Sequence, residues 1–295
     1  MTFFAMPIFL GNLFQQLYNT VDSLIVGNFL GSSALAAVSS SGSLIFMLIG
    51  FLSGISAGAG VIVARFFGAG DEKNLQRAVH TTVAFGLVAG VLMTGVGVAL
   101  SPQILRWMDT PESVMRESVT YLQIYFAGSL GFVMYNVLVG ILQAVGDSRH
   151  PLYYLIVSSV INLVLDLLFI TGFHTGVGGA AVATVISQIV SALLCFWQLL
   201  RTKESYGLKI RKIRFDKGIL VQIIKIGLPS GVQNSIIAFA NVIVQSNINA
   251  FGEMAMAGYG AYTKVEGFGF LPINSFTMAL TTFVGPVSYT HLTLP

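Results

Sequence analysis

Two aspartates stand inside long apolar segments of this sequence, where an isolated charge is costly. Asp22 lies in the apolar run 3–30 and Asp166 in the run 152–172, with Asn162 one helical turn before it. An acid near the centre of a bilayer costs about 2.5–3.5 kcal/mol on insertion scales, so it needs a partner, water or an ion. Two neighbouring carboxyl groups in apolar surroundings can share a proton or hold a hard cation. The residues therefore predict a proton or sodium site, although hydrogen-bonded helix packing alone would also use such polar pairs.

The first apolar run carries its polar residues at steps of three and four, the spacing that places side chains on one face of an α-helix. These residues are Asn12, Gln15, Gln16, Asn19, Asp22 and Ser23. A membrane helix with such a stripe does not face lipid all round. We expect the stripe to line a wet cavity.

The composition predicts an all-α polytopic membrane protein. Of the 295 residues 55% are hydrophobic and 9% charged, with a mean hydropathy of +0.80, which excludes an ordinary soluble domain. Each long apolar segment exceeds the roughly 20 residues that cross a bilayer, and is too long for the strands of a membrane barrel. The predicted spanning helices are 3–30, 34–64, 78–100, 118–142, 152–172, 177–200, 219–250 and 254–285.

Lysine and arginine are distributed unequally between the two sets of loops. With a cytoplasmic N-terminus, the outer loops hold only Arg106 and Arg116, and the inner side holds all the others except Lys264, most of them between Arg201 and Lys225. This asymmetry predicts that the N-terminus lies in the cytoplasm. We expect the membrane to be the plasma membrane. The net charge of +3 then needs no nucleic-acid partner. We expect the basic segment to lie along the lipid surface.

In this orientation the acids share one depth. At 1.5 Å per residue, Asp22 lies roughly 9 Å, and Asp166 roughly 7 Å, to the outer side of the middle of its run. Thr184, on the following inward helix, lies roughly 7 Å to the same side. Together with Asn162 they can form one site in the outer half of the membrane.

The sequence after the basic segment repeats features of its beginning. An offset of 222 residues aligns Asn12 with Asn234 and Asn19 with Asn241, and a small gap then aligns Gly31 with Gly252. The repeat predicts two parallel six-helix lobes, of which the second shows only its first two helices. We expect a first lobe at 1–200, a basic cytoplasmic linker at 201–218, the start of a second lobe at 219–285, and a tail at 286–295 that is not native. The predicted cavity-lining residues on the two striped helices are Asn12, Gln15, Asn19, Asn234, Asn241 and Gln245.

Two helices carry further patterned residues. Gly50, Gly54 and Gly58 recur at four-residue steps, which predicts that another helix approaches closely along this face. In the last run, we expect Lys264 and Glu266 to compensate each other's charge locally, and contact of Glu266 with the substrate is the alternative.

Several motifs resemble those of the MATE (multidrug and toxic compound extrusion) transporters. They are LYNTVDSLIVG at 17–27, ALAAV at 34–38, GDSRHP at 146–151, NLVLD at 162–166, GAAVAT at 179–184 and TFVG at 282–285. The resemblance implies a twelve-helix antiporter of two lobes, here truncated after about eight helices, that exports cationic or amphipathic organic compounds in exchange for H⁺ or Na⁺. It also implies that Asp22, Asn162, Asp166, Thr184 and Tyr121 couple the cation.

The resemblance places the coupling in the first lobe, because Val244 stands opposite Asp22 in the repeat. It implies a monomer in the bilayer with a small organic substrate, no catalytic residue, and no cofactor or metal beyond the coupling ion. One alternative is a lipid-linked oligosaccharide flippase of the same superfamily, which would require a basic cavity. Another is a membrane protein that does not transport in this truncated form. An intramembrane enzyme would need a nucleophile or metal set, and no such pairing is present at suitable spacing.

Overall fold

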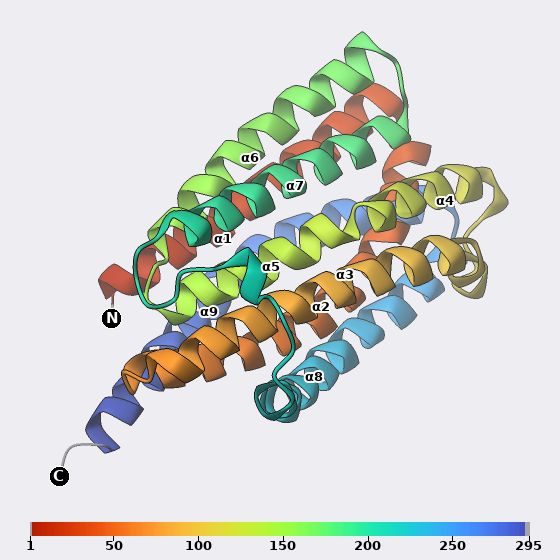
Figure 1. The fold of residues 1–295 in the computed structure, drawn as a ribbon. Helices are drawn as coiled ribbons and strands as arrows, with labels where there is room; N and C mark the ends of the chain where they lie inside the picture. The colour runs from red at the N-terminus through yellow and green to blue at the C-terminus, as the bar shows by residue number, and fades with distance from the viewer. Residues whose placement is uncertain (1, 293–295) are drawn as a thin grey trace.

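The protein is a bundle of long helices (Figure 1). The computed structural model describes residues 2–292, except for the side chains of residues 2–5, 7, 8, 43, 47, 48, 278, 279 and 281–292. Within this range all regular secondary structure is helical. The predicted tail, 286–295, lies outside the residues whose side chains are described.

The helices follow the predicted apolar runs closely. They are α1 (Thr2–Leu30), α2 (Ser32–Gly68), α3 (Glu72–Trp107), α4 (Glu112–Ala127), α5 (Ser129–Ala144), α6 (Arg149–Leu167), the π-helical turn η1 (Leu168–Gly172), α7 (Val177–Arg201), the 3-10 turn η2 (Ile210–Lys212), α8 (Lys217–Asn249) and α9 (Glu253–Leu292). Within the described part of the chain, five of them are long and apolar enough to cross a membrane, or six with α4 and α5 counted as one span. The all-α, multi-pass membrane fold is confirmed.

The predicted helix 118–142 is not one straight helix. Its residues divide between α4 and α5, which meet at Gly128 with a bend of 51°. A Cβ atom at Gly128 would lie 2.3 Å from the Cγ1 atom of Val185 on α7. The bend thus occurs where α7 packs directly on the backbone, which the run of apolar residues alone does not reveal.

The glycines of α2 lie against α8, as their spacing predicts. A Cβ at Gly54 would lie 2.2 Å from the backbone nitrogen of Gly231, and one at Gly58 would lie 2.4 Å from that of Gly227. The two helix backbones are therefore in direct contact, with glycine on both sides. The predicted close approach is confirmed.

The last helix, α9, packs against both α1 and α2. At one end Ser32 and Ser33, at the start of α2, donate hydrogen bonds to the Glu253 carboxylate at the start of α9. The turns before these two helices use Gly31 and Gly252, the pair that the sequence repeat aligns, at φ angles of 89° and 86° that only glycine adopts freely. The division of the chain into two lobes stays a prediction.

Candidate functional site

The site is centred on two buried carboxyl groups, one from each of two packed helices. Asp22 of α1 is 8% exposed and Asp166 of α6 is fully buried at 0%. Helices α1 and α6 pack side by side, and the two carboxyl groups lie close enough to share a hydrogen bond. The predicted proximity of the two acids, 144 positions apart in sequence, is present in the structure.

Most polar atoms of this pair lack a conventional partner. Among the described residues, no N–H or O–H group donates to Asp22 Oδ1 or to either Asp166 oxygen. One turn earlier on α6, Asn162 is 1% exposed and its Nδ2 group is likewise unpaired. Two ionised carboxylates cannot bond to each other, so burial of this pair requires a proton or a cation between or beside them.

Tyr121 extends the cluster from α4. Its side chain is 5% exposed, packs in the same apolar cluster as Ile25 of α1 and Ala180 of α7, and lies within electrostatic reach of both aspartates. Thr184 is also buried, but its hydroxyl donates to the Ala180 carbonyl of its own helix at 3.0 Å. The structure therefore brings Tyr121 to the carboxyl pair, and shows Thr184 bonded within α7.

Two neighbours of the pair were not predicted. Gln188, one turn beyond Thr184, donates through Nε2 to the Tyr18 hydroxyl at 3.2 Å, and Tyr18 lies one turn before Asp22. The Oε1 atom of Gln188 is buried without a hydrogen-bond partner. Tyr18 lies four residues before Asp22, and Gln188 lies four residues after Thr184. This helical spacing was the sequence signal that would have identified both.

The prediction that Lys264 and Glu266 neutralise each other is wrong. Residues two apart on a helix do not share a face, and no ion pair within 4.0 Å joins them among the residues described here. Glu266 instead accepts a hydrogen bond from the Tyr262 hydroxyl at 3.2 Å. Lys264 lies on the side of α9 that packs on α1, where its charge interacts with Asp22 across a gap longer than a direct ion pair.

The stripe of α1 is directed at α9. Asn12 Nδ2 donates to the Ser275 hydroxyl at 2.9 Å, and Gln16 Nε2 donates to the Lys264 carbonyl at 2.9 Å. Gln15 and Asn19 are half-buried on the same helix. Part of the predicted cavity lining thus makes helix contacts in this structure.

The stripe of α8 is divided between surface and core. Asn241 is exposed, and the exposed Asn234 donates to the Gly50 carbonyl of α2 at 3.3 Å. Gln245 is 0% exposed and donates to the Asn249 Oδ1 atom at 2.8 Å, so its side chain is buried in this structure, and its place in the cavity lining stays a prediction. Helix α8 packs along α2, whereas α1 packs along α6 and α9. The α8 stripe therefore faces different neighbours from the α1 stripe.

The described residues contain no group of three or more His, Cys, Asp or Glu side chains placed to hold a metal ion.

A family model described as MatE matches residues 7–168, which is more than half of the chain and includes both Asp22 and Asp166. The chain belongs to this MATE family.

Named relatives and solved structures agree with that assignment. "Probable multidrug resistance protein YoeA" of Bacillus subtilis (strain 168) is 33% identical over 290 residues, covering 96% of this chain and 63% of the relative. An outward-facing structure of a multidrug resistance MATE family transporter is 26% identical with a TM-score of 0.86, covering 97% of this chain and 64% of that one. An inward-facing structure of such a transporter is 27% identical with a TM-score of 0.82, covering 94% and 66%. This MATE-family chain thus spans somewhat less than two thirds of the relative's length.

Proposed function

We propose that the chain belongs to a secondary active transporter that exports cationic or amphipathic organic compounds in exchange for H⁺ or Na⁺. The single observation that supports this proposal is the buried pair of Asp22 and Asp166, whose oxygens lack protein donors. The names of the relatives, which include multidrug resistance and multidrug export proteins, support an organic substrate. Membership of the MATE family supports transport rather than catalysis.

The carboxyl pair would act by competition between the coupling ion and the substrate. A proton or Na⁺ held by Asp22 and Asp166 neutralises charge that is otherwise buried in apolar surroundings. If ion binding and substrate binding favour opposite-facing states, each ion that enters the cell resets the transporter. One charge moving through 100 mV releases about 2.3 kcal/mol, roughly a fifty-fold bias, which suffices to drive export.

The proposed orientation has a cytoplasmic N-terminus in the plasma membrane. Both tryptophans of the chain are exposed near helix ends, Trp107 at the end of α3 and Trp197 near the end of α7. Amphipathic rings concentrate at the two membrane surfaces. Arg201 stacks over the Trp197 ring at 4.4 Å and begins the basic linker, which supports a cytoplasmic position for this end.

The test is ion-driven efflux of a fluorescent organic cation from liposomes that contain the purified chain. Asp22→Asn or Asp166→Asn should lower ion-driven efflux by at least ten-fold, because the amide cannot take up an exchangeable proton or neutralise a bound ion. Glu117→Gln is the matched control, because Glu117 is an exposed acid on α4, the helix that carries Tyr121.

The control variant should transport at the unmodified rate. Undiminished ion-driven efflux in both aspartate variants would contradict the coupling role of the pair. If the unmodified chain binds the dye but gives no efflux, this would contradict transport by the 295-residue chain.

A further inference from the structure

The basic linker, residues 201–218, is hydrogen-bonded to the helix bundle. After α7 it folds back, so that the Leu208 amide bonds to the Leu199 carbonyl at 2.8 Å. From α3, Gln76 Nε2 donates to the carbonyls of Ser205 and of Gly207, the latter at 3.0 Å. These contacts hold the first half of the linker by its backbone, and the Leu208 side chain, 4% exposed, is buried in the core.

Buried side chains of α3 also hold the second half of the linker. His80 is 3% exposed, and its Nε2 atom accepts the Lys209 amide at 3.0 Å while Nδ1 bonds to the Gln76 carbonyl at 2.6 Å. Thr81, at 0% exposed, accepts the Asp216 amide through its hydroxyl at 3.1 Å. Both anchors again bind backbone groups.

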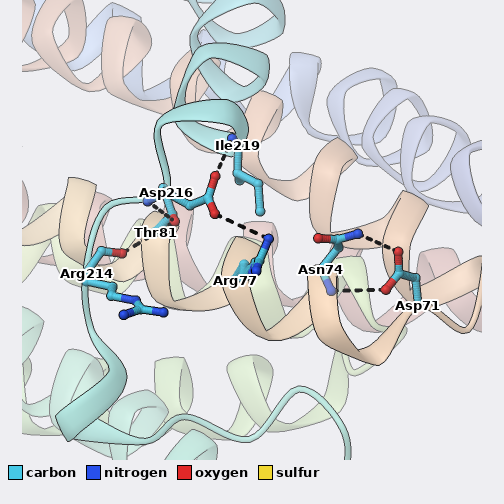
Figure 2. Close-up of polar contacts among 7 residues, drawn as sticks. All are labelled: Asp71, Asn74, Arg77, Thr81, Arg214, Asp216 and Ile219. Atoms are coloured by element: carbon cyan, nitrogen blue, oxygen red, sulfur yellow. Dashed lines mark hydrogen bonds and ion pairs between the residues drawn. The ribbon is translucent and has the colours of Figure 1, made fainter.

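Asp216 fastens the end of the linker to the first turn of α8. Figure 2 shows its carboxylate between the Ile219 amide, at 3.2 Å, and the Arg77 guanidinium of α3, at 3.7 Å. In the same view the Thr81 hydroxyl lies between Arg214 and Asp216. The segment between Lys209 and Asp216 is thus fixed at both of its ends.

The outward face of this fixed segment is both cationic and apolar. Ile210 is 60% exposed and Phe215 is 45% exposed, although both are large apolar side chains. The exposed basic residues that surround them are Lys209, Arg211, Lys212, Arg214 and Lys217. Exposed apolar side chains among lysine and arginine are the chemistry of a segment that lies on an anionic membrane surface.

The height of the linker on α3 matches that surface. Arg77 and Arg106 are the exposed charged residues that flank the apolar part of α3, and they lie about 43 Å apart along the helix, which matches the thickness of a bilayer with its headgroups. Thr81, which anchors the linker, lies about 6 Å from Arg77 towards the membrane centre. The polar layer of each leaflet is about 5–8 Å thick. The anchored segment is therefore placed at the level of the lipid headgroups.

We propose that residues 209–217 form a fixed docking surface for anionic phospholipid headgroups, with Ile210 and Phe215 inserted at the edge of the acyl layer. Arg211 and Lys212, on the η2 turn, bind the phosphates. His80 and Thr81 are positioning residues, because they hold the linker backbone at headgroup height and do not touch the lipid. The proposal is independent of transport, so it can fail while the proposed function stands.

The test measures local lipid composition beside the linker. The full chain carries a fluorophore at Lys217→Cys, since Cys195 is buried and stays unlabelled. It is placed in bilayer nanodiscs that contain either phosphatidylglycerol or phosphatidylcholine with a nitroxide at carbon 5 of one acyl chain. We expect the phosphatidylglycerol to quench the label several-fold more strongly. Arg211→Gln with Lys212→Gln should abolish most of this preference, because each basic residue near the surface contributes about 1 kcal/mol, which corresponds to about five-fold in lipid binding.

The matched control removes two other exposed basic residues at the same end of the bundle, Lys73→Gln with Arg149→Gln. It should leave the lipid preference unchanged. A second variant, Thr81→Val, removes no charge but frees the Asp216 amide, and should lower the preference because the linker is no longer held in place. Gel filtration and helix content would show that each variant is folded.

Equal quenching by the two lipids would overturn the proposal. So would a loss of lipid preference in the Lys73/Arg149 control as large as in the Arg211/Lys212 variant, because it would indicate general surface charge rather than a docking site. A further measurement is quenching of the label by aqueous iodide. If the label is protected from iodide only when polyglutamate is added to phosphatidylcholine discs, the proposal is overturned, because the linker would then bind an acidic protein segment.

Discussion

At the scale of single residues, the chemistry of this chain depends on which polar groups have partners. Asp22 and Asp166 are buried with oxygens that no protein donor reaches, whereas most buried polar groups in folded proteins are hydrogen-bonded. Lys264 is the nearby cation whose charge reaches Asp22. An ion or a proton would complete the pair, and this supports the coupling role that we propose for it.

Asp71 is a contrasting acid, because its partners are complete. At the N-terminus of α3 it accepts the Asn74 backbone amide at 3.1 Å and the Asn74 side-chain amide at 2.6 Å. These bonds favour the ionised form and lower the pKa of Asp71 below its ordinary value of 3.8. Because the pKa is lowered in the folded state, the stabilisation is complete above the ordinary value and is lost as pH falls through the lowered one.

We therefore expect Asp71→Ala to increase fraying of the first turn of α3 at neutral pH, since Asn74 loses its cap. Amide hydrogen exchange at Asn74 and Leu75 should become faster than in the unmodified chain. The difference should shrink as the pH falls below 3.8 and Asp71 is protonated. A difference that stays constant across that range would show that the cap does not act through the carboxylate.

At the scale of helices, the glycine spacing of α2 predicts a close helix–helix contact, and the structure shows that contact with α8. Gly54 and Gly231 face each other with no room for a Cβ atom. Without a hydrophobic force between helices in lipid, van der Waals contact of this kind is a main source of association. Any added methyl group must push the two backbones apart.

Gly54→Ala should therefore lower the free energy of unfolding by about 1–3 kcal/mol, the usual effect of overpacking. Gly95→Ala is the matched control, because Gly95 is also within a long helix but has no atom within 4 Å of its added Cβ. The control should be neutral or stabilising by up to about 1 kcal/mol, because alanine favours helix. Unfolding in mixed micelles would measure both. Equal effects of the two substitutions would contradict the packing argument.

At the scale of the whole molecule, helices from both ends of the sequence meet around the first helix. Helix α1 packs on α6, which supplies Asp166, and on α9, which supplies Lys264. The charge state of the carboxyl pair is thus coupled to a helix that belongs to the second copy of the predicted repeat.

In liposomes, an imposed inward gradient of H⁺ or of Na⁺ should drive efflux of an organic cation, and the gradient that drives it identifies the coupling ion. Asp166→Asn should remove the response to that gradient, because one side of the ion site is lost. The control is a potassium gradient of the same size as the H⁺ and Na⁺ gradients, imposed at the same membrane potential. It should give no efflux. Equal efflux with all three ions would indicate a leak rather than coupled exchange.

The all-α fold with several long apolar helices, the glycine face of α2 and the two intramembrane aspartates were predictable from the sequence, because segment length and helical periodicity are local properties. Of the eight predicted spans, the described part of the chain shows five, or six with α4 and α5 counted as one. The bend at Gly128, the burial of Gln245 and the proximity of Lys264 to Asp22 were not predictable. Each depends on which helix packs against which, and on how each helix is rotated about its axis. Those choices are made by contacts between residues far apart in the sequence, as between Gly128 and Val185 or between α1 and α9, and only the tertiary structure decides them.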